Sequence, residues 1–427
     1  MAPTEVDTRA LLSLSLEKKA FRVDLSWLIG TGAKPAVGTE HLYEPTTSFY
    51  LIPVPPWMAA VLGRQKAALG TAAVTCVGQL LGNTTHHPKA DILGSSSAYR
   101  PTVHRLRQSL PALALKSGTP RMHAALALCQ TGLVSPGRVF YGAVTGAQIV
   151  TACEHNYRHL GWLFGDERLP VQEQLVGARV VATPSAIRNV FKSLAESVEW
   201  ADKAHCAAPT LQSWVVRHRA IVAFIAATAE FCLCLRDADC YVIDGLELIS
   251  QHRAPHINDK KVHPLGGGPA AGKPDLLMQV VQAWCAYLGS AQRDELLIGD
   301  VAGERIAVHA AQALELREHA LLFNVDIHGD RHDVGDDAWL RLLPTSLRLV
   351  ENFGRHFWPK ACHDRGLGQR HLDYLLRHRL HAWEHLSNVD PVPSSRVRSE
   401  LVRVLNAVIG ELQLDVPAIL RMDGRSA

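Results

Sequence analysis

The sequence has no long apolar run, no dominant charge of one sign and no regular cysteine spacing. Its most apolar stretch, residues 220–235, contains Glu230 and is shorter than the ~20 residues needed to cross a bilayer, so it predicts a buried helix. Lys+Arg number 44 and Asp+Glu 41, and the resulting net charge of +3 identifies no partner. Because 47% of the 427 residues are hydrophobic, disorder is excluded and about two or three domains are expected.

The nine cysteines are odd in number, scattered and mostly flanked by apolar residues. This pattern favours small buried side chains in a reducing compartment over disulfides. Cys232 and Cys234 are two residues apart on a predicted helix and cannot face one metal ion, so no zinc site is expected. At the N-terminus, acidic residues precede the only apolar run of residues 1–19, whereas a secretory signal has basic residues before its apolar run. We therefore expect a cytoplasmic protein that does not enter a membrane.

Two familiar catalytic motifs are also missing. Residues 267–273 have the glycine and lysine spacing of a phosphate-binding loop, but Pro274 stands where a magnesium-binding hydroxyl is needed. No Gly-x-Ser-x-Gly elbow indicates a serine hydrolase. The sequence thus predicts neither a bound cofactor nor a metal.

Composition divides the chain into three parts. Residues 1–35 are interpreted as a short polar arm or helix, and residues 36–204 as a mostly helical domain in which 51–58 is too rich in proline for a regular element. Helix-start residues Thr183-Pro184-Ser185 precede the last helix of this domain. Residues 205–427 form the third part.

The third part begins with a helix at about 211–235, whose inward face is expected to bury Val215, Val222, Ile225 and Ala229. A β-rich stretch at 241–250 and short strands at Ile257 and 262–265 follow, around a charged turn at 258–261. Helical patterns resume from about residue 274. The predicted fold class is mainly α with a small β-sheet (α+β).

The most informative stretch lies near the C-terminus. Arg355 follows Asn352 early in a predicted helix, a glycine break comes at 366–368, and a second short helix ends at His378. This pattern resembles the catalytic core of tyrosine recombinases, the phage-integrase family, which has His-x-x-Arg-His, a glycine turn and Leu-Gly-His. In this sequence Asn352 replaces the first His, Arg355 matches an arginine, and His378 matches the last His, with Arg377 in place of glycine.

The resemblance implies further site residues upstream. The family's first catalytic arginine follows a buried helix in a segment like Ala-Thr-Gly-Leu-Arg, and Arg236 fits this position with Cys234 in place of glycine. The family's lysine lies in a hairpin turn, where Lys260 falls 24 residues after Arg236 and Lys261 is the fallback. The resemblance therefore implies a helical core-binding domain followed by a recombinase-like catalytic core.

These residue types fit cleavage of a DNA phosphodiester. Two arginines can bind the phosphoryl oxygens, and lysine or histidine can protonate the leaving 5′ oxygen. A covalent phosphotyrosine would conserve the bond energy without ATP or metal. No tyrosine follows Tyr374, however, and Ser387 or Leu386 stands at the position of the nucleophile. We expect either loss of strand cleavage or use of a partner recombinase's tyrosine.

The C-terminal charge distribution agrees with phosphate binding. Residues 341–403 contain eleven Lys/Arg and six Asp/Glu, a net charge of +5, so the rest of the chain is net negative. Beyond Pro393 an apolar stripe predicts a helix that packs in cis or docks on a neighbouring protomer; it consists of Val397, Leu401, Val404, Leu405 and Val408.

Three functions remain open. The first is a double-stranded-DNA-binding, tyrosine-recombinase-like protein in site-specific recombination or integration of a mobile element, acting by self-association or with a partner recombinase. The second is a non-enzymatic DNA-binding regulator that retains only the fold. The third is a helical protein-interaction scaffold unrelated to DNA, for which Arg236, Lys260, Arg355 and His378 would not cluster.

Overall fold

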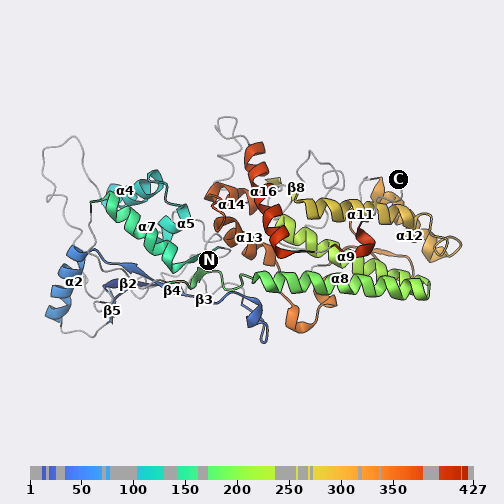
Figure 1. Cartoon of the computed structure of the whole chain (residues 1–427), viewed down its shortest axis with the longest axis horizontal. Helices are drawn as coiled ribbons and strands as arrows, with labels where there is room; N and C mark the ends of the chain where they lie inside the picture. Colours follow the sequence, from blue (N-terminus) through green and yellow to red (C-terminus); the bar gives the residue numbers. More distant parts are fainter. Residues whose placement is uncertain are drawn as a thin grey trace. The chain divides into compact units, whose positions relative to one another are not determined.

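A computed structural model describes most of the chain. The described residues are 12–15, 19–25, 34–69, 74–76, 103–128, 142–161, 172–235, 256–257, 268–269, 273–315, 320–335, 338–377, 394–414 and 416–421. They are largely helical with several small sheets, so the coarse α+β prediction is confirmed (Figure 1).

The chain forms two compact units. The N-terminal unit comprises Met1–Ala33 and Pro45–Arg179, and the C-terminal unit comprises Lys34–Glu44 and Val180–Ala427. The predicted boundary at 204/205 falls inside one continuous helix, α8 (Pro184–Ala207). Because α8 packs against α9 (Leu211–Leu233), it belongs with the C-terminal unit and the division lies upstream of it.

The N-terminal unit combines sheets with helices. One sheet has the strand order β4-β2-β1-β5 and is antiparallel throughout; in the other, β7 pairs parallel with β3 and antiparallel with β6. The strands are β1 (Leu12–Ser15), β2 (Ala20–Asp24), β3 (Thr46–Thr47), β4 (Phe49–Pro53), β5 (Val74–Cys76), β6 (Ala143–Thr145) and β7 (Leu175–Gly177). The helices are α2 (Pro56–Leu69), α4 (Val103–Lys116), α5 (Arg121–Ala127) and α7 (Gly146–His159).

Two predictions for this unit are corrected. The segment expected to be a polar arm contributes β1 and β2 to the first sheet, and the proline-rich segment 51–58 contains the end of β4 and the start of α2. Both elements accommodate their prolines. Pro53 lies on the edge strand β4, where a missing N–H removes no interior ladder bond, and Pro56 is the first residue of α2, whose N–H would have no intrahelical partner.

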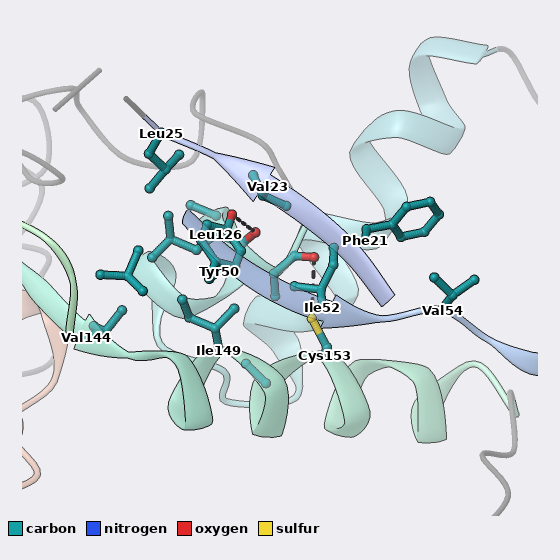
Figure 2. Close-up of a cluster of buried hydrophobic side chains, with 14 of the residues drawn as sticks. Phe21, Val23, Leu25, Tyr50, Ile52, Val54, Leu126, Val144, Ile149 and Cys153 are labelled. Atoms are coloured by element: carbon teal, nitrogen blue, oxygen red, sulfur yellow. Dashed lines mark hydrogen bonds between the residues drawn. The ribbon is translucent and has the colours of Figure 1, made fainter. Parts of the chain in front are cut away.

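The core of the N-terminal unit lies between β2, β4 and the helices α5 and α7 (Figure 2). Tyr50 is 1% exposed, and its hydroxyl donates a 2.7 Å hydrogen bond to the carbonyl of Leu126, which ties β4 to α5. Ile149 of α7 is fully buried in the same cluster. The sheet is thus covered by helices, and the helices predicted for this region are only part of its architecture.

The C-terminal unit is built around α9. Its helices are α8, α9, α11 (Asp275–Ala291), α12 (Val301–Leu314), α13 (Phe353–His363), α14 (Gln369–Leu375) and α16 (Ser394–Leu412). Short 3-10 helices are η2 (Glu40–Leu42), η6 (Leu340–Leu342), η7 (Thr345–Leu347) and η8 (Ala418–Leu420). Two short antiparallel pairs join β8 (His256–Ile257) to β9 (Gly268–Pro269) and β10 (Asn324–Val325) to β11 (Arg331–His332).

The apolar composition of α9 explains its central position. It packs against α8, α11, α13 and β10, as expected of a helix that is mostly apolar on all sides. Among the described residues, no helix is long and apolar enough to span a membrane. The predicted inward positions Val215, Val222, Ile225 and Ala229 are all at most 5% exposed, which confirms that face. Phe191, near the start of α8, contacts Phe231 near the end of α9, so the two helices form an antiparallel hairpin.

The C-terminal stripe also packs within the chain. All five of its apolar residues are at most 4% exposed, and α16 contacts α8, α11, α13 and α14. The prediction of packing in cis is confirmed. The stripe is therefore already covered by the helices of its own unit.

Candidate functional site

The structure describes two of the six predicted site residues, Asn352 and Arg355. The other members of the predicted set lie outside the described residues: Arg236, Lys260, His378, Ser387 and the fallback Lys261. The roles of these five residues stay predictions. The described geometry concerns the chain segments that lead into them.

Arg355 lies in the first turn of α13, as predicted, and is 1% exposed. Its Nη1 donates a 3.0 Å hydrogen bond to the carbonyl of Cys234, and its Nη2 donates a 2.9 Å bond to the carbonyl of Leu376. Cys234 ends α9 and Leu376 ends α14. A single buried guanidinium therefore joins the ends of two helices to the start of a third.

Arg377 binds the same end of α9. Its Nη1 donates to the carbonyl of Leu233 at 2.8 Å and its Nη2 to the carbonyl of Cys234 at 2.6 Å. The last carbonyls of a helix have no intrahelical partner and carry the negative end of the helix dipole, so cations stabilise them. The side chains of Arg355 and Arg377 thus converge on one backbone oxygen, that of Cys234.

Cys234 and Arg377 share an unusual backbone conformation. Their φ angles are 51° and 56°, in the left-handed region, and Cys234 is the C-cap of α9. This region is roughly 1–2 kcal/mol less favourable for a residue with a side chain, and glycine is the residue that usually occupies it. These are the two positions at which the recombinase pattern has glycine and this sequence does not.

Glu230 fixes the start of α13. It is 7% exposed, and its carboxylate accepts hydrogen bonds of 2.9 Å from the backbone N–H of Asn352 and from Nε1 of Trp339. Asn352 also has a left-handed backbone, with φ 63°. Asn352, which the recombinase resemblance matches to a histidine, is therefore held through its backbone N–H by Glu230 of α9.

Helices α9 and α13 approach each other closely at Gly354. A Cβ atom at this position would lie 3.1 Å from the carbonyl oxygen of Glu230 and 3.1 Å from Cα of Phe231. Nearby, Nε1 of Trp358 donates a 2.6 Å hydrogen bond to the carbonyl of Phe231, and Phe231 stacks on Phe353. The position of Arg355 thus depends on a contact between two helices that a larger residue would push apart.

We predict that Gly354→Leu lowers the free energy of unfolding by about 2–3 kcal/mol, because its side chain overlaps the backbone of α9. Urea unfolding measures the change. The matched control is Gly410→Leu in α16, where nothing lies within 4 Å of the added Cβ. This control is expected to raise stability by about 0.5–1 kcal/mol through helix propensity. Equal stability of the two variants would contradict the close approach.

The hairpin predicted to carry Lys260 is described at its base. His256 pairs with Pro269 and Ile257 with Gly268 in antiparallel register. The residues between the two strands, 258–267, include Lys260 and lie outside the described residues, as do 241–250. The partner of the strand at Ile257 is therefore 268–269, whereas the sequence favoured 262–265.

The described residues contain no group of three or more His, Cys, Asp and Glu side chains that could hold a metal ion. Cys232 and Cys362 are fully or almost fully buried, and burial raises the pKa of both thiols. His356 follows Arg355 and is 2% exposed; burial, with a smaller effect of Arg355, lowers its pKa to about 3. At neutral pH both thiols are therefore protonated and His356 is uncharged.

A pocket of about 190 Å³ borders α13 and α16 and is lined by none of the predicted site residues. Its cations are paired: Nζ of Lys360 lies 2.6 Å from Oδ2 of Asp364, and Arg365 forms an ion pair with Glu411. The positive charges of Lys360 and Arg365 are therefore neutralised by neighbouring carboxylates within the pocket lining. It is not a continuation of the arginine cluster at the end of α9.

Sequence reasoning missed Arg377 and Glu230 as structural members of this site. In the sequence, Arg377 stands out only as a departure from glycine, and Glu230 only as a charge in an apolar helix. Both were visible signals, because a charge in a buried helix requires partners and a non-glycine residue at a glycine position requires compensation. Their partners are more than 100 residues away in sequence, which the pattern does not reveal.

Comparison with known proteins found no matching family model, no similar curated protein and no similar solved structure.

Proposed function

We propose that this chain is a DNA-binding, tyrosine-recombinase-like protein of site-specific recombination or integration of a mobile element, working beside a recombinase that supplies the nucleophile. Its C-terminal unit would hold a DNA phosphate with Arg236, Lys260 and His378. Arg355 would support that site by binding the carbonyls of Cys234 and Leu376, each two residues before a predicted site residue. Double-stranded DNA is the proposed ligand, and no metal or ATP is needed for phosphate binding by these side chains.

The observation that carries the proposal is the backbone at Cys234 and Arg377. The recombinase pattern has glycine at both positions, and here both residues have positive φ although neither is glycine. The resemblance was drawn from residue types alone, so a backbone requirement for glycine at the same two positions is independent support. Many helices end with one left-handed residue, so the support comes from finding both of these residues at the glycine positions of the pattern.

Arg355 adds support through the segments that it joins. It binds Cys234, two residues before Arg236, and Leu376, two residues before His378. Two residues of extended chain span at most about 7 Å. We infer that the described segments leading to Arg236 and to His378 start from neighbouring points around Arg355, as a site shared by the two residues requires.

Charge distribution between the units supports nucleic-acid binding. The N-terminal unit has 16 Lys/Arg and 9 Asp/Glu, a net charge of +7, and the C-terminal unit has 28 and 32, a net charge of −4. Between Glu44 and Glu154 the only acid is Asp91, against nine Lys/Arg. The C-terminal excess at 341–403 therefore has a larger counterpart in the N-terminal unit, where non-specific phosphate contacts would be made.

The second candidate, a non-enzymatic DNA-binding regulator, is favoured by one observation. The guanidinium of Arg355 is buried and donates to two backbone carbonyls, a structural role that needs no substrate. Trapping on nicked suicide DNA substrates, with and without a partner recombinase, separates the candidates. Strand exchange that requires this chain and is lost in Arg236→Ala supports the first, and strand exchange that persists in that variant supports the regulator.

DNA binding itself gives a direct prediction. The wild-type chain is expected to bind duplex DNA at 50 mM salt and to lose affinity steeply by 200 mM salt, as measured by fluorescence anisotropy, because bound cations release condensed counterions. Charge reversal of exposed or half-exposed residues between Glu44 and Glu154, in the basic N-terminal unit, should weaken binding. It should also reduce the slope of affinity against salt concentration by about 0.9 per lost contact. The variant combines Arg64→Glu, Lys66→Glu and Lys116→Glu.

A matched control makes the same charge change in the acidic C-terminal unit. It combines exposed residues in Lys192→Glu, Lys203→Glu and Arg293→Glu. This control should retain clearly more affinity than the N-terminal variant. Absence of any duplex binding by the wild-type chain at low salt would overturn both DNA-binding candidates.

A further inference from the structure

Arg377 carries an unusual combination of backbone and side-chain features. Its φ of 56° disfavours any side chain, and glycine would relieve this strain. Its guanidinium nevertheless reaches across 143 residues of sequence to Cys234 and also binds Leu233. The strained backbone is therefore retained together with two charged hydrogen bonds that glycine could not make.

The two bonds connect segments with predicted roles. The carbonyls of Leu233 and Cys234 belong to the last turn of α9, immediately upstream of Arg236, and Arg377 itself immediately precedes His378. Arg355 clamps the same carbonyl of Cys234 from α13. The exit of the chain from α9 is thus held from two sides.

We propose that Arg377, which stands where the recombinase pattern has a flexible glycine, is a positioning residue. Its two hydrogen bonds to the carbonyls of Leu233 and Cys234 are called the clasp. The clasp fixes the end of α9 against the end of α14, the described segments from which the chain continues to Arg236 and to His378. It acts through these segments and does not contact the phosphate. This inference rests on the proposed function and adds a residue that the recombinase pattern does not contain.

The decisive variant is Arg377→Gly, which relieves the backbone strain and removes the clasp. It is expected to weaken duplex binding at least fivefold while leaving the salt slope unchanged, since no phosphate contact is lost. Hydrogen exchange at 230–235 and at 374–377 should accelerate together. Arg377→Lys, which keeps the charge but can make fewer of the bonds, should recover part of the affinity.

Gln413→Gly is the matched control. Gln413 follows α16 with φ 53°, so the substitution relieves similar strain in the same unit without removing a clasp. It should leave DNA affinity and hydrogen exchange at 230–235 unchanged and raise the melting temperature. Circular dichroism establishes that each variant is folded before its affinity is compared.

The outcomes separate this inference from the proposed function. Wild-type protein that does not bind duplex DNA overturns the proposed function, whatever the exchange data show. Wild-type binding with unchanged affinity in Arg377→Gly overturns the clasp alone. A fall in salt slope of about 0.9 in Arg377→Gly also overturns it, because Arg377 would then contact phosphate directly.

Discussion

Replacing Arg355 by alanine is expected to lower the free energy of unfolding of the C-terminal unit by about 3–5 kcal/mol. The change removes the 2.9 Å bond to the carbonyl of Leu376 and one of the two guanidinium bonds to the carbonyl of Cys234, in a site where Arg355 is only 1% exposed. It also opens a cavity of side-chain size between α9, α13 and α14. Urea unfolding followed by far-ultraviolet circular dichroism measures the loss.

Arg348→Ala is the control for this prediction. Arg348 is exposed, and its Nε donates a 3.3 Å hydrogen bond to the carbonyl of Leu343. Loss of this single surface bond should change stability by about 0.5 kcal/mol or less. If Arg355→Ala is as mild as Arg348→Ala, Arg355 does not join the three helices. The expected result also means that Arg236→Ala, and not Arg355→Ala, is the clean probe of phosphate binding.

Acidification is expected to destabilise the C-terminal unit strongly through two buried histidines. Burial is the main cause that lowers the pKa of His218 and of His356 from 6.5 to about 3. Between these values the unfolded chain binds a proton at each histidine and the folded chain does not, so stability falls as pH falls from about 6.5 towards 3. Between pH 7 and pH 5 each histidine should remove about 2 kcal/mol of stability.

His218 offers the sharper test of this acid sensitivity. Its Nε2 lies 3.1 Å from the carbonyl of Phe323, and its ring stacks on Trp214 at a centroid distance of 5.0 Å. His218→Phe keeps an aromatic ring there and removes the titration, so urea unfolding from pH 7 to pH 5 should show a slope reduced by up to about 1.4 kcal/mol per pH unit. Measurement at pH 8 isolates the packing and hydrogen-bond loss. An unchanged slope would refute the assignment to His218.

Local sequence signals predicted the helices of the C-terminal unit well. Thr183 caps α8 by accepting a hydrogen bond from the N–H of Ala186, as the Thr-Pro-Ser sequence indicated. The start of α13 near Arg355 and the buried stripe of α16 were also predicted. These features depend on residues three or four apart, which face one another on a helix whatever the tertiary structure.

The strands of the N-terminal unit were not predictable by the same reasoning. Strands β1 and β2 are only four and five residues long, in a segment interpreted as an arm, and their alternation is too short to stand out. Strand β1 is completed by β5, whose residues lie about sixty positions later, Ser13 pairing with Cys76. A strand acquires its stability from such partners, and the partners are not encoded locally.

The candidate site shows the same division. By itself the sequence determined that Arg355 begins a helix, that α9 is buried, and which residue types resemble a phosphate site. Only the tertiary structure decided that Cys234 and Arg377 take left-handed backbones and that Arg355 and Arg377 meet at the carbonyl of Cys234, across 121 and 143 residues. The physical reason is that periodicity and capping depend on neighbours within one helical turn, whereas a helix end obtains its hydrogen-bond partners from whichever distant segment packs against it.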